Sequence, residues 1–383
     1  MSKGKGEEAI IQRREKFSWS IDPNAYSRSL FLCLAEYEDY GMVSYSILSV
    51  KLRDLFSYAG YFQKPQLQLQ QVRKFSGNNL PFFLGCGVWR SNILLGGGTE
   101  PRYDHGPYAN QPVMGYFHHH PARQIYCFDK HTNEFPLKEM LRGNVQPLLV
   151  ELDDKLYALG KSVTGASFEV FDPNDNEWSS LPYPRVDCLS YPFAIRDRWA
   201  IYDQYFAVAG RRILVSDGIA SYWFDTADPK QGWRGLDEFP FMGSTVVVDD
   251  GEQFVLFVFK PSDFDVPHIS VHLISYDFEY IKRDYSHVSL PLDFPKCCPG
   301  YLGDLPLSNH TLVHVGDKIV CLLVSSEQKW TFMCVAFQFI VNGGDEALPP
   351  LIIKFLPRSV LVDECIDMDM ASSAGQMLGA FLL

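Results

Sequence analysis

Histidine residues concentrate in one stretch of the chain, residues 103–124, which reads YDHGPYANQPVMGYFHHHPARQ. Four of the ten histidines lie there, and His118–His120 are consecutive. Imidazole is a common zinc ligand, so two of these histidines with Asp104 or His105 have the donor types of a metal site. Successive side chains of an extended chain point to opposite sides, however, so three adjacent histidines rarely bind one ion. We therefore predict a solvated insertion loop without a metal, and a metal site is the alternative.

The same stretch is our first candidate for contact with a ligand, because long loops in compact domains often carry function. The candidate binding residues are Arg102, Asp104, His105, His118, His119 and His120. We predict no cofactor. The sequence LGGGTEP at 95–101 lacks the Gly-Lys-Ser/Thr ending of a phosphate-binding loop, so its glycines are expected to belong to a turn.

Composition and charge limit the classes of partner. The chain has 383 residues, of which 46% are hydrophobic and 21% charged, the ordinary balance of a globular protein. Its formal net charge of −12 repels phosphate backbones and anionic lipids, so we expect neither a nucleic acid nor a membrane partner. The longest apolar stretches are also shorter than the roughly 20 residues of a membrane-spanning helix.

The cysteines and the first residues indicate the cellular compartment. The nine cysteines are an odd number without a C-x-x-C pair, and several lie in apolar runs, where a free thiol behaves as a small hydrophobe. The first residues are charged on both sides of an Ile pair and lack the apolar region of a secretory signal. We predict a cytoplasmic or nuclear protein.

The strands that we expect on either side of the insert follow a repeating pattern in the sequence. Aromatic residues make up 14% of the chain, which favours sheet. In the segment 156–182, LYALGKSVTGASFEVFDPNDNEWSSLP, one expected strand ends in Asp172 and the next begins near Trp178. The same order of Asp, polar turn and aromatic residue recurs as Asp129 with Phe135, Asp225 with Trp233, and Asp277 with Tyr285. The four Asp residues are 43, 53 and 52 positions apart, and repeats of about 40–50 residues are typical of propeller blades.

These features resemble the kelch repeat, in which a strand, a glycine pair, a strand ending in an aromatic residue and Asp, a turn and a Trp follow one another. The segment 156–182 is the best match, although Gly160 is followed by Lys161 where the family has a second glycine. The segment 93–137 keeps the glycines but has Phe135 in place of Trp. The degenerate repeats are most similar to plant kelch-type proteins, here without an F-box-like or BTB-like module in the first 80 residues.

The resemblance implies an all-β, kelch-type β-propeller with six blades, and seven blades are the alternative. We expect an N-terminal tail at 1–25, the propeller at 26–361 and a C-terminal segment at 362–383. The expected blades are 26–75, 80–143, 146–185, 190–240, 242–295 and 305–361. A propeller ring usually closes through strands from both termini, so either KFSWSI at 16–21 or QMLGAFLL at 376–383 is expected to supply the closing strand.

The resemblance implies binding and names no reaction. Kelch-like plant specifier proteins hold iron with Glu, Asp and His at steps of four residues. Glu100 and Asp104 match the first step, but Tyr108 occupies the His position, so we do not expect iron. We predict a monomeric, non-catalytic scaffold or regulator that binds a protein partner in a plant cell. The alternative is a specialised-metabolism enzyme or a small-molecule-binding protein that uses the central face of the propeller.

Overall fold

The strands of the protein form five β-sheets in a computed structural model. The model describes residues 27–37, 43–56, 69–77, 79–100, 121–129, 134–161, 167–183, 205–216, 220–236, 239, 241–260, 268–289, 310–316, 318–325, 331–341, 351–355, 363–364 and 374–383. Four sheets are separate, and the fifth has eight strands, because β4 and β8 pair in parallel and join two four-stranded halves. The described strands therefore form six four-stranded units, which are antiparallel throughout.

The units are numbered in chain order. Within each unit the strands are given in their order across the sheet, so that neighbours in the text are hydrogen-bonded. Unit 1 consists of β25 (Ala374–Leu382), β1 (Ser29–Tyr37), β2 (Val43–Lys51) and β3 (Gln70–Gly77). Unit 2 consists of β4 (Gly85–Trp89), β5 (Asn92–Gly96), β6 (Ile125–Phe128) and β7 (Glu134–Pro136). Unit 3 consists of β8 (Val145–Leu152), β9 (Lys155–Lys161), β10 (Ser167–Asp172) and β11 (Glu177–Leu181).

The remaining units have the same order. Unit 4 consists of β12 (Tyr205–Ala209), β13 (Arg212–Ser216), β14 (Ser221–Asp225) and β15 (Trp233–Leu236). Unit 5 consists of β16 (Ser244–Asp249), β17 (Phe254–Lys260), β18 (His268–Ile274) and β19 (Ile281–Ser289). Unit 6 consists of β20 (His310–Gly316), β21 (Ile319–Ser325), β22 (Thr331–Val341) and β23 (Leu351–Phe355), and β24 (Asp363–Glu364) also pairs with β22. Within the described ranges, the helices are α2 (Leu52–Phe56) and the 3-10 helix η5 (Pro229–Gln231), and both are short.

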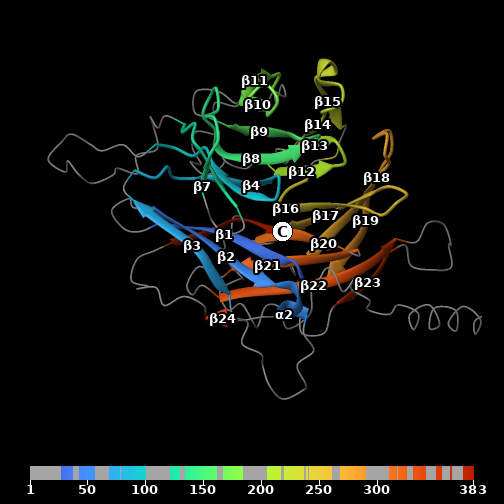
Figure 1. The fold of residues 1–383 in the computed structure, drawn as a ribbon. Helices are drawn as coiled ribbons and strands as arrows, with labels where there is room; N and C mark the ends of the chain where they lie inside the picture. Colours follow the sequence, from blue (N-terminus) through green and yellow to red (C-terminus); the bar gives the residue numbers. More distant parts are fainter. Residues whose placement is uncertain are drawn as a thin grey trace, which may run out of the picture.

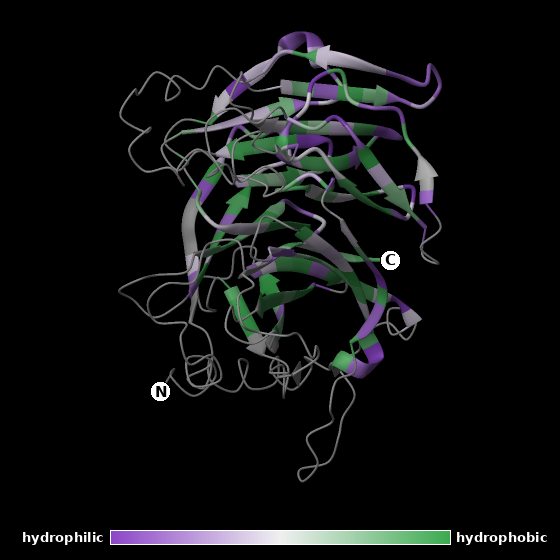
Figure 2. Ribbon diagram, turned by 90° about the vertical axis from the view of Figure 1, so that its left-hand side faces the viewer, coloured by the Kyte–Doolittle hydropathy of each residue, from purple (hydrophilic) through white to green (hydrophobic). Residues whose placement is uncertain are grey.

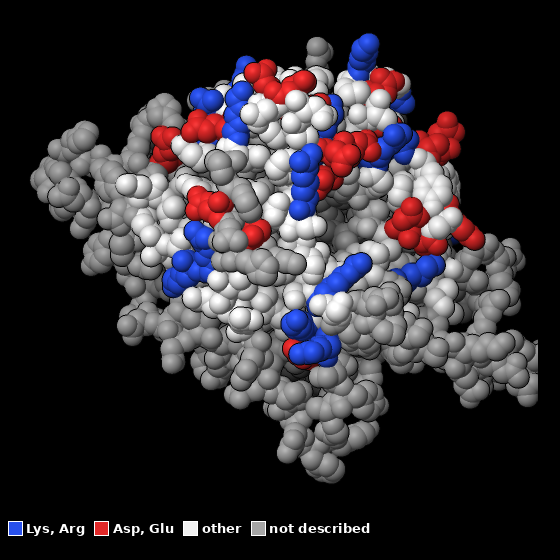
Figure 3. Space-filling view, in the orientation of Figure 1, with Lys and Arg blue, Asp and Glu red and all other residues white. Residues whose placement is uncertain are grey.

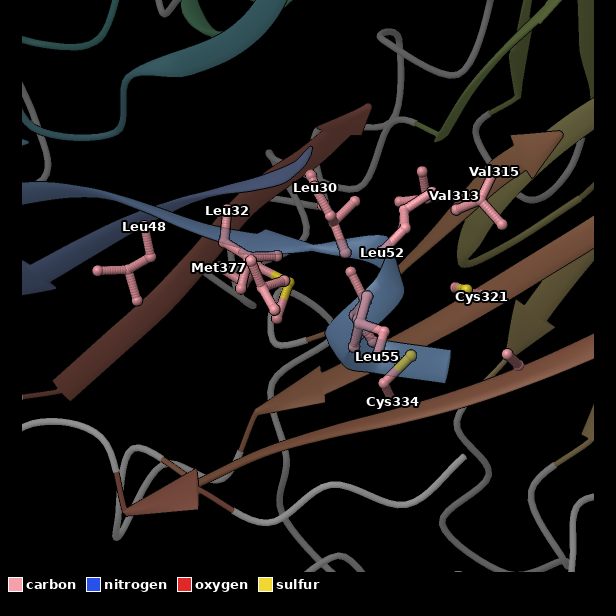
Figure 4. Packing of buried hydrophobic residues seen from close by; sticks show 14 of the residues in the cluster. Leu30, Leu32, Leu48, Leu52, Leu55, Val313, Val315, Cys321, Cys334 and Met377 are labelled. Atoms are coloured by element: carbon pink, nitrogen blue, oxygen red, sulfur yellow. The ribbon is translucent and has the colours of Figure 1, made fainter. Parts of the chain in front are cut away.

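The units follow one another around the middle of the molecule. Figure 1 shows units 3 and 4 at the top, unit 5 at the right, unit 6 and unit 1 below, and unit 2 at the left. Six clusters of buried apolar side chains lie between consecutive units, and one of them joins unit 6 back to unit 1. Figure 4 shows this last cluster, where Leu30 of β1 lies near Val313 of β20 and Leu55 of α2 lies near Cys334 of β22. The described core is therefore a cycle of interfaces between consecutive units.

Strand β17 shows how the sequence produces this arrangement. Its residues are apolar from Phe254 to Phe259 without alternation, the pattern of a strand that is buried on both faces. Val255, Phe257 and Phe259 face the cluster shared with unit 6, while the residues between them face the cluster shared with unit 4. Each such buried side chain stabilises the fold by about 1.5–3 kcal/mol. Figure 2 shows hydrophobic residues along many of the strands and hydrophilic residues at many of their ends.

The two ends of the units form two different faces. In each antiparallel unit, the connections from first to second and from third to fourth strand lie at one end, and the remaining connections lie at the other. The Ser244 hydroxyl, at the start of β16, donates to the carbonyl of His310, at the start of β20, over 2.7 Å. The first strands of units 5 and 6 therefore begin at the same end of the molecule. The turn face carries the connections 90–91, 153–154, 173–176, 210–211, 226–232, 250–253 and 275–280. On the loop face, the described connecting residues are 97–100, 121–124, 137–144, 220, 239 and 241–243.

Candidate functional site

The predicted binding residues of the insert lie outside the described residues, but the chain on both sides of it is described. The candidate residues are Arg102, Asp104, His105, His118, His119 and His120, and their role stays a prediction. Phe82 and Thr99 form an antiparallel bridge, with N–H···O distances of 2.9 and 2.7 Å. The amide of Ala122 donates to Gly98 over 2.8 Å, and the amide of Gly98 donates to the Asn144 carbonyl over 2.7 Å. The two stems of the insert are thus bonded to each other and to the connection between units 2 and 3.

The glycines before the insert permit this contact. Gly97 and Gly98 have φ values of 73° and 88°, a left-handed conformation that favours glycine. A Cβ on Gly97 would overlap with the carbonyl oxygen of Asn144, and a Cβ on Gly98 would overlap with that of Phe82. The glycine run therefore forms a close-packed turn at the base of the insert.

A buried acidic side chain contacts the connection 137–144. Glu169 of β10 is 0% exposed and accepts hydrogen bonds from the amides of Leu141 (2.7 Å) and Arg142 (2.8 Å). The Ser167 hydroxyl lies 3.1 Å from Glu169 Oε1 and 2.8 Å from Oδ1 of Asn144. Burial raises the pKa of Glu169, and the backbone and hydroxyl donors oppose this rise. Because both carboxylate oxygens accept bonds from the chain itself, the group holds the connection 137–144 in place.

Other buried polar side chains form hydrogen bonds near the loop-face ends of the strands. In unit 1, Glu36 is 2% exposed and accepts hydrogen bonds from Ser44 (2.9 Å) and from Lys74 (3.0 Å). In unit 4, the Ser216 hydroxyl accepts the amide of Phe241 over 3.0 Å, and the Ser221 hydroxyl donates to the carbonyl of Phe239. In these units the loop face is held by polar groups that are removed from water.

On the turn face, Asp side chains organise the turns. Oδ1 of Asp172, Asp225 and Asp277 accepts the amide two residues later, over 2.9, 2.9 and 3.0 Å respectively. The hydrogen bond from Lys155, whose Nζ is 2.7 Å from Asp172 Oδ2, lowers the pKa of Asp172. Asp129 follows β6 directly.

The aromatic residues after these turns occupy different environments. Trp178 pairs with Phe171, is 5% exposed and donates its indole N–H to the Lys138 carbonyl over 2.8 Å. Trp233 pairs with Phe224 in the same register but is only half-buried. In unit 5 the corresponding pair is aliphatic, Ile274 with Ile281, while Tyr285 lies further along β19. Phe135 pairs with Cys127 in unit 2, and Gly160 pairs with Ser167 in unit 3.

Sequence reasoning did not identify Glu169, Ser167 or Asn144. One signal was present, because side chains alternate along β10 and Glu169 therefore shares a side with the buried Phe171. An acidic residue on the apolar side of a strand indicates a buried acceptor that needs donors. Those donors are backbone amides, which no residue type in the sequence reveals.

Among the residues that the structure describes, no three His, Cys, Asp or Glu side chains are grouped as metal ligands would be. No helix in the described ranges has the length and apolar character needed to cross a bilayer.

Six four-stranded antiparallel units in a cycle, with buried polar groups at one face and Asp-stabilised turns at the other, define a β-propeller-like all-β protein. The chain belongs to the family described as Protein of unknown function (DUF1668), whose model matches residues 117–337. None of the curated proteins compared with the chain matches it.

Several solved structures are similar to the chain at low identity. An α-L-arabinofuranosidase from Clostridium thermocellum ATCC 27405 is 11% identical, with a TM-score of 0.39 over 73% of this chain and 94% of that one. A functionally unknown protein from Desulfotomaculum acetoxidans DSM 771 is 11% identical, with a TM-score of 0.42 over 86% and 79%. The β-propeller domain of the Trilobed protease from Pyrococcus furiosus is 13% identical, with a TM-score of 0.33 over 80% and 82%. At these TM-scores the similarities support no inference about the function of this chain.

Proposed function

We propose that the chain is a six-bladed, kelch-type β-propeller that binds a protein partner and catalyses no reaction, as a scaffold or regulator. The six units and the interface between units 6 and 1 support six blades in a closed ring. The Asp-centred turns followed by Trp178 and Trp233 support the kelch type.

One observation carries the binding function, namely the frame at the base of the insert. The two stems of the 101–120 insert are bonded to each other and to Asn144, and Glu169 and Ser167 hold the same connection from below. A rigid scaffold that fixes the ends of a long loop is the usual construction of a binding surface. Because Glu169 accepts backbone amides of the connection 137–144, we assign it a structural role at the base of the insert and not a role in acid–base chemistry.

The test replaces residues 101–120 by a Gly/Ser linker of equal length. Proteins that co-purify with the tagged chain are then quantified for the wild type, the linker variant and Asp175→Lys, which changes an exposed charge on the turn face. We expect at least one protein that is lost with the linker variant alone. A linker variant that melts at the wild-type temperature and retains every enriched protein would contradict binding through the insert.

A further inference from the structure

The turn between β18 and β19 presents two aromatic side chains to solvent. Tyr276 is 41% exposed and Tyr280 is 59% exposed. Within the described part of the chain, the other exposed large hydrophobic residues are Leu141 and Ile340, which lie in other units. We call the segment Ser275–Tyr280 the tyrosine turn. Exposed Tyr side chains are among the residues that are enriched as anchors of protein interfaces.

The tyrosine turn is held rigidly by its own bonds and by unit 4. The amide of Ser275 donates to the Tyr280 carbonyl over 2.9 Å, and the amide of Tyr280 donates to the Ser275 hydroxyl over 3.0 Å. Phe278 is buried beneath the turn, and the guanidinium carbon of Arg212 lies 4.6 Å from its ring centre. Arg212 also donates a hydrogen bond to the Tyr276 carbonyl. A preorganised surface loses little conformational entropy when it binds.

Acidic side chains lie near Tyr276. The Tyr276 hydroxyl donates to Asp249 over 2.6 Å, and this bond, together with burial and the charges of Asp249, Asp250 and Glu252, raises the pKa of Tyr276 to about 12. Glu252 and Glu279 are exposed on the two adjacent turns. In Figure 3, Asp and Glu side chains gather at the right-hand side of the face, where Figure 1 places the ends of β16–β18. The surface thus combines exposed aromatic rings with negative charge.

We propose that the tyrosine turn, with Glu252 and Glu279, binds an extended Arg-rich segment of a partner protein. A guanidinium group stacks on an exposed aromatic ring and pairs with a carboxylate in two parallel hydrogen bonds, whereas an ammonium group does neither as well. Acidic segments and nucleic acids are repelled by the same carboxylates. This surface is on the turn face, so the inference is independent of binding through the insert.

The test is a titration of the full chain against labelled peptides, followed by fluorescence anisotropy at physiological salt. The probes are short peptides of alternating Arg and Gly, of Lys and Gly, and of Glu and Gly. We expect the Arg peptide to bind more tightly than the Lys peptide, and the Glu peptide not to bind. The double variant E252K/E279K should weaken binding of the Arg peptide by about tenfold or more, and Tyr280→Ala by roughly fivefold or more.

A charge-matched control separates this surface from general electrostatics. The double variant D175K/E177K reverses two exposed acids on the β10–β11 turn, where Trp178 is buried. It should leave the affinity of the Arg peptide unchanged. Equal losses in the two double variants, an unchanged affinity in Tyr280→Ala, or equal binding of the Lys peptide would each overturn the proposal. All these side chains are exposed, so unchanged melting temperatures will verify that the variants are folded.

Discussion

Strand β10 carries two acidic residues with opposite roles, Glu169 in its first half and Asp172 at its end. Glu169 is fully buried and accepts the amides of Leu141 and Arg142, which precede it by 28 and 27 positions. Asp172 is partly exposed and accepts the amide of Asn174, two positions later. Burial raises the pKa of Glu169, while the bonds from Lys155 and Asn174 lower the pKa of Asp172. The loop face is thus held at Glu169 by bonds to a segment 27 and 28 positions away, and the turn face at Asp172 by bonds to the following turn and to the neighbouring strand β9.

The largest effect is expected where an aromatic ring supports the Asp172 end of the strand. Trp178→Ala removes a ring that packs 5.4 Å from Phe171 and removes its bond to Lys138, so it should lower the free energy of unfolding by about 3–5 kcal/mol. The matched variant Trp233→Ala affects a half-buried ring and should lower it less. Urea denaturation measures both. A Trp178→Ala variant as stable as the wild type would exclude this ring from the core.

Removing the buried acid should have the next largest effect. Glu169→Ala leaves the amides of Leu141 and Arg142 without their acceptor in a buried position, and we expect a loss of about 2–3 kcal/mol. Hydrogen exchange should show faster exchange of these two amides than in the wild type. If their exchange is unchanged while the stability falls, the carboxylate does not hold the connection 137–144.

Asp172→Ala should have a smaller effect than Glu169→Ala, because Asp172 and its partner Lys155 are both partly exposed and water weakens their interaction. The same denaturation experiment gives the order of the two variants. The amide of Asn174 should exchange faster, whereas those of Leu141 and Arg142 should not change. The reverse order of stabilities would remove the distinction between the two ends of the strand.

The two acids should also affect the pH dependence of stability with opposite signs. The folded state raises the pKa of Glu169 above 4.5, so its favourable contribution is present at low pH and is lost as pH rises through the folded pKa. Folding lowers the pKa of Asp172 below 3.8. The stabilisation by Asp172 is therefore present above pH 3.8 and is lost as pH falls through the folded pKa. Unfolding free energies from about pH 3 to 6 for the wild type, Glu169→Gln and Asp172→Asn measure both contributions. For each variant, the difference in unfolding free energy from the wild type is plotted against pH. Slopes of the same sign for Glu169→Gln and Asp172→Asn would contradict the environments assigned to the two acids.

The sequence permitted prediction of the all-β, propeller-like fold because its signals are local. The pairing of Phe171 with Trp178 across a turn that contains Asp172 involves few consecutive residues. In unit 5 the local pattern is less informative. Tyr276 and Asp277 resemble the end of a strand, yet β18 ends at Ile274 and Tyr276 lies in the following turn, exposed.

The candidate site was only partly predictable for the same reason. The insert could be recognised by its length and its histidines, and the role of its residues stays a prediction because they lie outside the described ranges. The Glu169 network could not be predicted, because its amides belong to a segment 27 and 28 positions away. Tertiary packing alone brings that segment to β10.

The pairing of β25 with β1 links a strand that is synthesised early to one that is synthesised late. The Tyr37 hydroxyl bonds to Gln376, 339 positions later, over 2.8 Å. At about 5–20 residues per second, translation needs roughly 20–70 s to pass from one to the other. Throughout that interval the edge of β1 that β25 will cover lacks its partner strand. The nascent chain therefore carries an open strand edge until β25 emerges, and open strand edges in general can pair with other chains.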